Sequence, residues 1–268
     1  MNFVKKTVLF LTLFLISNFC FLVPKTHAQE FTFDKAYQDY VYTQTTYGRA
    51  YSDYERAKDF YLKNQTLTLK EDVRKKTYSM LRERDELERV YLAALRIKLI
   101  EIKVAVLPKL DSEIEWYKNH KESYKDPDPL ENLFNKSKEV ESRYKSDTYL
   151  VIYDTLFNIT LGEMSNLRVS HEEVYKSIRE NLDKNVSEGK LKIDPFNRWL
   201  TDIDLVIQNL KDNDEKAKKN ISKIYEGSFV SPLSAYNSAV VPFVSSTTLL
   251  MQLNSFLGEF LTSLENQL

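Results

Sequence analysis

Apolar residues recur at intervals of three or four along almost the whole chain after position 29, which is the period of a helix buried on one side. No stretch shows the sustained two-residue alternation of apolar and polar residues that is typical of β-strands. Because only short segments separate the periodic regions, consecutive helices should be antiparallel, and we expect an all-α, elongated up-and-down bundle with coiled-coil-like packing. The pattern predicts about six long helices, near 34–64, 69–117, 129–165, 170–189, 195–227 and 231–268.

Capping residues, glycines and prolines mark most of these predicted helix ends. Thr68 with Glu71, and Ser170 with Glu173, have the spacing of a capping box, in which a hydroxyl and a carboxylate satisfy free backbone amides. Pro108 lies inside the second predicted helix and lacks an amide hydrogen, so we expect a kink there. The other predicted boundaries are Asp128-Pro129, Asp194-Pro195 and Ser231-Pro232 at helix starts and Gly189 and Gly227 at helix ends, with a bend at Pro242.

The first 28 residues have a different character. Lys5 and Lys6 precede an apolar run at 7–23, and a cut after Ala28 would have small residues one and three positions before it. This order predicts a signal peptide at 1–28 and a helical bundle at 29–268, which would divide, if at all, at the turn 125–130. The alternative is an uncleaved membrane anchor, although the 17-residue run is short against the ~20 residues that span a bilayer.

Signal-peptide cleavage would place the protein outside the cell or in its envelope and would also change its composition. The single cysteine, Cys20, lies in the removed segment, so the mature chain would have no disulfide. Removing three lysines from the 38 basic residues leaves 35 against 39 acidic ones. Because the two signs are interleaved, the chain lacks the basic patch of a nucleic-acid-binding protein, and we expect no nucleic-acid partner.

The sequence carries no pattern that predicts a catalytic chemistry. It has no H-E-x-x-H, no G-x-S-x-G and no glycine-rich phosphate loop. His120 and His171 lie in polar stretches and are expected at the surface, as are the charged run 70–89 and the aspartates at 202, 204, 212 and 214. We therefore predict no catalytic residue, cofactor or metal, and not an enzyme. A carboxylate pair that meets only in the folded chain is the open alternative.

Tyrosines occupy a heptad pattern in the first predicted helix. One track at seven-residue spacing runs from Phe33 to Tyr61, and a second lies four residues behind each of its members. A third track, which contains Ala36 and Ala57, leaves room for a neighbouring helix to approach closely. We define the tyrosine strip as Tyr37, Tyr40, Tyr47, Tyr51, Tyr54 and Tyr61. Because a tyrosine buries its ring but needs a partner for its hydroxyl, we expect the strip to pack on the next helix with its hydroxyls at the rim. The alternative is an exposed strip that recognises a partner helix, a peptide or a glycan.

The stretch 228–258 contains no charged residue, although 29% of the chain is charged. Its apolar residues continue at helical spacing beyond it to Leu268, so we expect one buried face and a serine- and threonine-rich face covered by another helix or a second protomer. Together these features predict an exported helical bundle with a structural or protein-interaction role, including self-association. The alternative is a membrane-active, pore-forming-type protein that uses the 228–258 stretch, and membrane contact could also occur through an uncleaved N-terminal segment.

Overall fold

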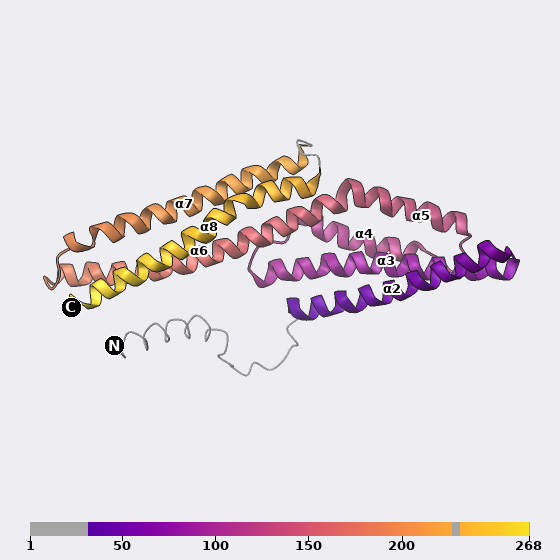
Figure 1. Ribbon diagram of the computed structural model, residues 1–268, viewed down its shortest axis with the longest axis horizontal. Coiled ribbons are helices and arrows are strands. Elements are labelled where there is room, and N and C mark those ends of the chain that lie inside the picture. The colour runs from indigo at the N-terminus through magenta and orange to yellow at the C-terminus, as the bar shows by residue number, and fades with distance from the viewer. Residues whose placement is uncertain (1–31, 227–230, 268) are drawn as a thin grey trace. The chain divides into compact units, whose positions relative to one another are not determined.

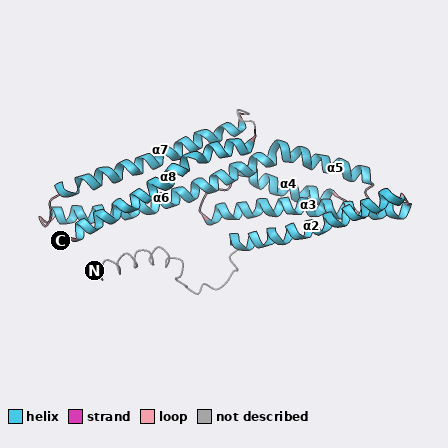
Figure 2. Ribbon diagram, viewed as in Figure 1, coloured by secondary structure: helices cyan, strands magenta, loops and turns pink. Residues whose placement is uncertain are grey.

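The computed structural model describes residues 32–226 and 231–267 (Figure 1). The predicted signal peptide at 1–28 and the predicted helix end at Gly227 lie outside these residues and stay predictions. Every element in the described ranges is helical (Figure 2), so the predicted all-α bundle is confirmed. The helices are α2 (Phe33–Asn64), α3 (Leu67–Glu101), α4 (Pro108–Ser123), α5 (Leu130–Arg143), α6 (Tyr149–Ser187), α7 (Asn197–Ser222) and α8 (Pro232–Glu265).

Helices α2 and α3 form an antiparallel hairpin that a very short turn closes. Gln65 adopts a left-handed conformation with φ of 39°, and the hydroxyl of Thr66 accepts a hydrogen bond from the Leu69 amide at 3.3 Å. The predicted cap at Thr68 was therefore two residues too late. As expected, the buried side chains of α2 are small, namely Ala36, Thr43 and Ala57.

The second predicted helix is wrong as a single element, because the chain reverses before Pro108 instead of kinking. Residues 102–107 form a loop in which Lys103 has a left-handed φ of 60°, and α4 then runs back along α3 with Pro108 in its first turn. A proline disfavours helical conformation in the residue before it, whereas its fixed φ suits the first position of a helix. The turn at 125–130 joins α4 to α5, and a division of the bundle there stays a prediction. Asp128 does not cap α5; its carboxylate instead binds the Lys125 amide and Lys136.

The predicted break at Ser170 is also wrong, because one helix crosses this position. A π-helical turn at Tyr144–Thr148 connects α5 directly to α6, whose 39 residues extend about 58 Å. The Ser170 hydroxyl donates to the Asn166 carbonyl at 3.0 Å inside the helix instead of capping a new one. As predicted, the chain leaves helical conformation at Gly189, which has a left-handed φ of 73°.

Helix α6 contributes to two hydrophobic cores. Near its start, Val151, Ile152 and Ile159 pack with buried residues of α3 and α4. Nearer its end, Tyr175, Ile178 and Leu182 pack with the inner faces of α7 and α8. A Cβ atom at Gly162 would overlap the Val104 side chain, so a glycine between the two regions lets the 102–107 loop lie directly on α6.

Helix α8 begins as predicted and continues through its internal proline. The Ser231 hydroxyl accepts a hydrogen bond from the Ser234 amide at 3.2 Å, and Pro232 follows in the first turn. Pro242 cannot donate a hydrogen bond to the Ser238 carbonyl, and the Asn220 side-chain amide of α7 donates to that carbonyl at 3.2 Å instead. This bond explains how a proline is accommodated without ending the helix.

Candidate functional site

The structure places the tyrosine strip along one edge of the α2–α3 hairpin. Tyr40, Tyr47, Tyr54 and Tyr61 are half-buried, whereas Tyr37 and Tyr51 are exposed. Tyr40 packs on Tyr91 of α3 with ring centroids 5.3 Å apart, and Tyr51 lies between Tyr47 and Tyr54 at 6.2 and 6.3 Å. The strip is therefore neither a dry helix contact nor a fully exposed surface. Its rings are ordered by packing while part of each ring stays accessible.

Glu88 of α3 lies near this strip and is not matched by a counter-charge. It makes no side-chain hydrogen bond or ion pair with any residue in the described part of the chain, although Arg84 lies one turn before it. Burial is the main cause that raises the pKa of Glu88; Arg84 lowers it and the Asp85 carboxylate raises it, and the net result is a pKa of about 6. Burial also raises the pKa of Tyr47 and Tyr91, and the Glu88 charge adds to both shifts. Desolvation of an unpaired carboxylate is typical of functional sites, although buried structural groups show it too.

We predict that Glu88→Gln stabilises the protein by about 1 kcal/mol at pH 7 and has almost no effect at pH 4. The folded-state pKa lies above the ordinary value of 4.5, so the folded protein binds this proton more tightly than the unfolded chain does. The stability that comes from protonated Glu88 is complete below about pH 4.5 and is lost as the pH rises through 6. Urea denaturation between pH 4 and 8 measures the difference, with the exposed Glu173→Gln as the control. Equal stability of wild type and Glu88→Gln at pH 7 would contradict the prediction.

A second cluster of ionisable side chains lies in the core between α3, α4 and α5. Asp85 is fully buried, and its carboxylate accepts from Arg84 at 3.0 Å and contacts Nδ1 of His120 at 2.5 Å. The His120 ring stacks on Trp116 at 4.7 Å and meets Tyr124 edge-on at 5.1 Å. Surface positions for His120 and Asp85 were therefore wrong predictions. The Nε2 atom of His120 has no hydrogen-bond partner in the described part and lies 3.7 Å from a carboxylate oxygen of Glu139.

Glu113 of α4 forms the other buried ion pair of this core. Its carboxylate accepts from Arg143 at 2.5 and 3.1 Å and from the Thr148 hydroxyl at 2.7 Å. The Tyr117 hydroxyl forms a hydrogen bond with the same Thr148 hydroxyl at 3.2 Å. Burial raises the pKa of Tyr117. Within the described residues, no three histidine, cysteine or acidic side chains are grouped so that they could hold a metal. The carboxylates of Asp85 and Glu113 are bound by side chains that come from different helices, which is typical of structural ion pairs.

One of the α7 aspartates that were expected at the surface is buried instead. Asp214 is buried and pairs with Arg168 of α6 at 3.2 Å, and burial raises its pKa. Asp204 and Asp212 are exposed, as expected. Asp214 therefore joins α7 to α6.

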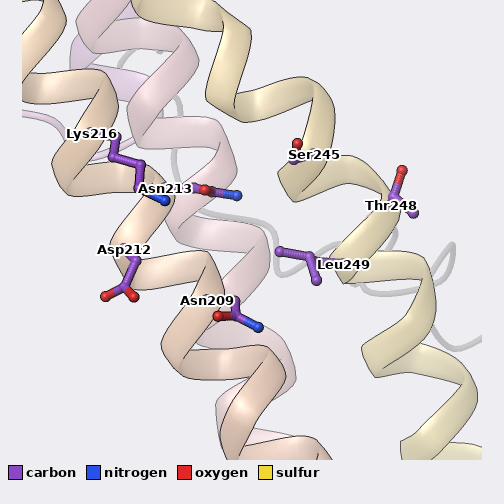
Figure 3. A pocket seen from close by; sticks show the side chains of 7 residues that line it. All are labelled: Asn209, Asp212, Asn213, Lys216, Ser245, Thr248 and Leu249. Atoms are coloured by element: carbon purple, nitrogen blue, oxygen red, sulfur yellow. The ribbon is translucent and has the colours of Figure 1, made fainter.

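An open groove of about 400 Å³ lies between α7 and α8 (Figure 3). Asn213 and Leu249 point toward each other from the two helices, and the Asn213 amide donates to Ser246 at 3.2 Å. The residues that line the groove are polar apart from one leucine: Asn209, Asp212, Asn213, Lys216, Ser245, Thr248 and Leu249. The serine- and threonine-rich face of α8 is therefore mostly uncovered in the single chain, although Ser246 is buried.

Comparisons with protein-family models, curated proteins and solved structures return no match for this chain.

Proposed function

We propose that the protein is exported and acts, outside the cell or in its envelope, as a non-catalytic helical scaffold that binds a protein partner through the tyrosine strip. The observation that supports this proposal is the half-exposed ordering of the rings along α2. Tyrosine offers a large amphipathic contact area with few rotatable bonds, which makes it common at protein interfaces. Rings that already pack on a neighbouring helix lose little further conformational entropy on binding.

The unpaired Glu88 carboxylate suggests the charge of the partner. A basic side chain placed beside Glu88 would supply an ion-pair partner, which Arg84, paired with Asp85, does not provide. Such a charge pair favours one orientation of the partner over others. We therefore infer a partner segment that combines apolar or aromatic residues with at least one lysine or arginine.

The partners of the core carboxylates favour a structural role for them over a catalytic one. Asp85 is bound by Arg84 and His120, and Glu113 is bound by Arg143 and Thr148. A catalytic acid or base has to reach its substrate within hydrogen-bond distance, and these two carboxylates are almost fully buried.

We expect replacement of both exposed strip tyrosines, Tyr37→Ala with Tyr51→Ala, to reduce recovery of the partner at least about tenfold, because interface aromatics carry much of the binding free energy. The measurement is affinity purification of the exported, tagged protein from its native source, followed by quantitative mass spectrometry. Tyr42→Ala is the matched control, since Tyr42 is 73% exposed on the same helix but outside the strip. Equal recovery from the double variant and wild type would refute this role of the strip.

The membrane-active alternative is still supported by one observation. Within the described ranges, α8 is the helix that is long and apolar enough to cross a membrane. Its inner face, however, forms part of the hydrophobic core with α6 and α7, so insertion would require that core to open. We therefore rank membrane activity second.

A further inference from the structure

Helix α8 carries two seams on opposite faces. At 100° per residue, Thr248 points away from Leu257, which belongs to the buried inner seam. The outer seam repeats with alternating steps of four and three residues, which is the heptad spacing of a helix that pairs with another helix. Its members are Asn237, Val241, Val244, Thr248, Met251, Ser255 and Gly258, all of them exposed.

The apolar residues of the outer seam are among the most exposed in the protein. Val241, Val244 and Met251 expose 63%, 73% and 69% of their surfaces. They lie on one stripe of the helix, at successive spacings of three and seven residues. Exposed apolar residues at heptad positions are typically buried when the helix pairs with a second helix in a coiled coil.

The charge pattern around the seam favours a second copy of this chain as the occupant. Positions beside a heptad seam usually carry glutamate and lysine, which select the partner. From 238 to 254 the flanking residues are uncharged, namely Ser238, Val240, Ser245, Thr247, Gln252 and Asn254, whereas Glu259 lies beside Gly258 at the end of the seam. A two-fold contact brings the same surface of both copies together, so charged flanks would risk like-charge contacts, whereas an uncharged surface avoids them. A partner helix with charged flanks would instead lose hydration without gaining an ion pair.

The order of residues along the seam matches an antiparallel pairing centred at Ser246. Positions equally distant from that centre have similar character: Val241 would meet Met251, Val244 would meet Thr248, and Asn237 would meet Ser255 of the second copy. Apolar residues thus face apolar or half-apolar ones, and polar residues face polar ones. A parallel pairing would instead align each residue with itself and place Asn237 against Asn237.

The neighbouring helix α7 supports the same centre independently. The bond from Asn213 to Ser246 places Asn213 at the level of the proposed two-fold axis. Asp212 and Lys216 lie on either side of this level at the groove, and Lys216 forms no ion pair with any described residue. The axis that pairs the seams therefore brings Asp212 of each copy toward Lys216 of the other.

We propose that the outer seam of α8, with Asp212 and Lys216 of α7 at its rim, is the interface of an antiparallel two-fold homodimer of this chain. Burial of the three apolar seam residues supplies the main attraction, and the two symmetric pairs of Asp212 with Lys216 fix the orientation. This surface is separate from the tyrosine strip on α2. Loss of the dimer would therefore leave the proposed partner binding unaffected, and loss of partner binding would leave the dimer unaffected.

Sedimentation velocity of the purified protein over a concentration series tests the dimer. Val244→Glu should raise the dimer dissociation constant at least about a hundredfold, because it places two like charges in the apolar seam of the dimer. Val174→Glu is the control, since Val174 is an exposed valine of α6, and it should leave dimerisation unchanged. Both positions are exposed, so circular dichroism should show unaltered folding for both variants.

A charge exchange tests the orientation. Asp212→Lys and Lys216→Asp should each weaken the dimer several-fold, and the double variant should restore it to within about threefold of wild type. A monomeric wild type at about 100 μM, a dimer unaffected by Val244→Glu, or a double variant no better than the single ones would overturn the proposal. Monomeric protein that floats with phosphatidylcholine–phosphatidylglycerol vesicles, and loses this with Val244→Glu, would overturn it in favour of a membrane surface.

Discussion

Arg143→Ala should lower the free energy of unfolding by about 3–5 kcal/mol, which is the usual effect of removing one member of a buried ion pair. Glu113 exposes only 3% of its side chain, and Arg143 supplies its counter-charge through two nitrogen atoms. Without Arg143, the carboxylate would keep the Thr148 hydroxyl as a donor but would lose its counter-charge in a desolvated position. Urea denaturation at pH 7 measures the change.

Lys145→Ala is the matched control for this prediction. Lys145 lies two residues further along and pairs with Glu141, but both side chains are well exposed. An exposed pair of this kind contributes at most about 0.5 kcal/mol, because water screens its attraction. Equal small effects of Arg143→Ala and Lys145→Ala would contradict the prediction that the buried pair of Glu113 with Arg143 stabilises the fold.

The sequence predicted the helical class and several helix ends because these depend on local chemistry. The cap at Ser231 and the left-handed Gly189 are determined by a few neighbouring residues, and both predictions were confirmed. The reversal before Pro108 and the continuity at Ser170 were missed. A kink and a full reversal have the same local signal, and only packing of α4 against α3 and of Gly162 against Val104 separates the two outcomes. A capping box is likewise a preference that tertiary packing overrides.

The buried ion pairs could have been suspected from the heptad positions but not from the residue types. Asp85 and Glu88 continue the seam of Leu81 and Leu92 at steps of four, three and four, and Glu113 and His120 occupy equivalent positions beside Tyr117 on α4. Charged residues at such positions are normally assigned to the surface. The distant partners, His120 for Asp85 and Arg143 and Thr148 for Glu113, lie 30 to 35 residues away, and no local pattern reveals them.

For the tyrosine strip, the sequence showed the spacing of the rings but not how deeply each ring is buried. Sequence spacing placed the rings on adjacent tracks and predicted a wet rim. The depth of each ring depends on the residues opposite it in α3, such as Tyr91 for Tyr40. The two tracks lie one turn apart but differ in exposure, and Tyr37 and Tyr51 are the exposed tyrosines of the strip.

Phe260→Ala should destabilise the protein by about 3–5 kcal/mol, since truncation of a fully buried aromatic removes apolar burial and leaves a cavity. Phe260 of α8 has no exposed surface and packs on Phe196 at 5.7 Å and on Trp199 at 6.3 Å, almost parallel to the indole. Thermal denaturation followed by circular dichroism and by tryptophan fluorescence measures the loss.

The Phe260→Ala variant also distinguishes a permanent core helix from a helix that is released to enter a membrane. If α8 is a permanent part of the core, as its contacts with α6 and α7 indicate, Phe260→Ala should lower the melting temperature of the whole bundle in one transition. Leu167→Ala, at an exposed position of α6, is the control and should change stability by less than about 0.5 kcal/mol. A releasable membrane helix would behave differently: the variant would stay stable, and only the fluorescence of Trp199 would change. That result would contradict the core role of α8 and favour the membrane-active alternative.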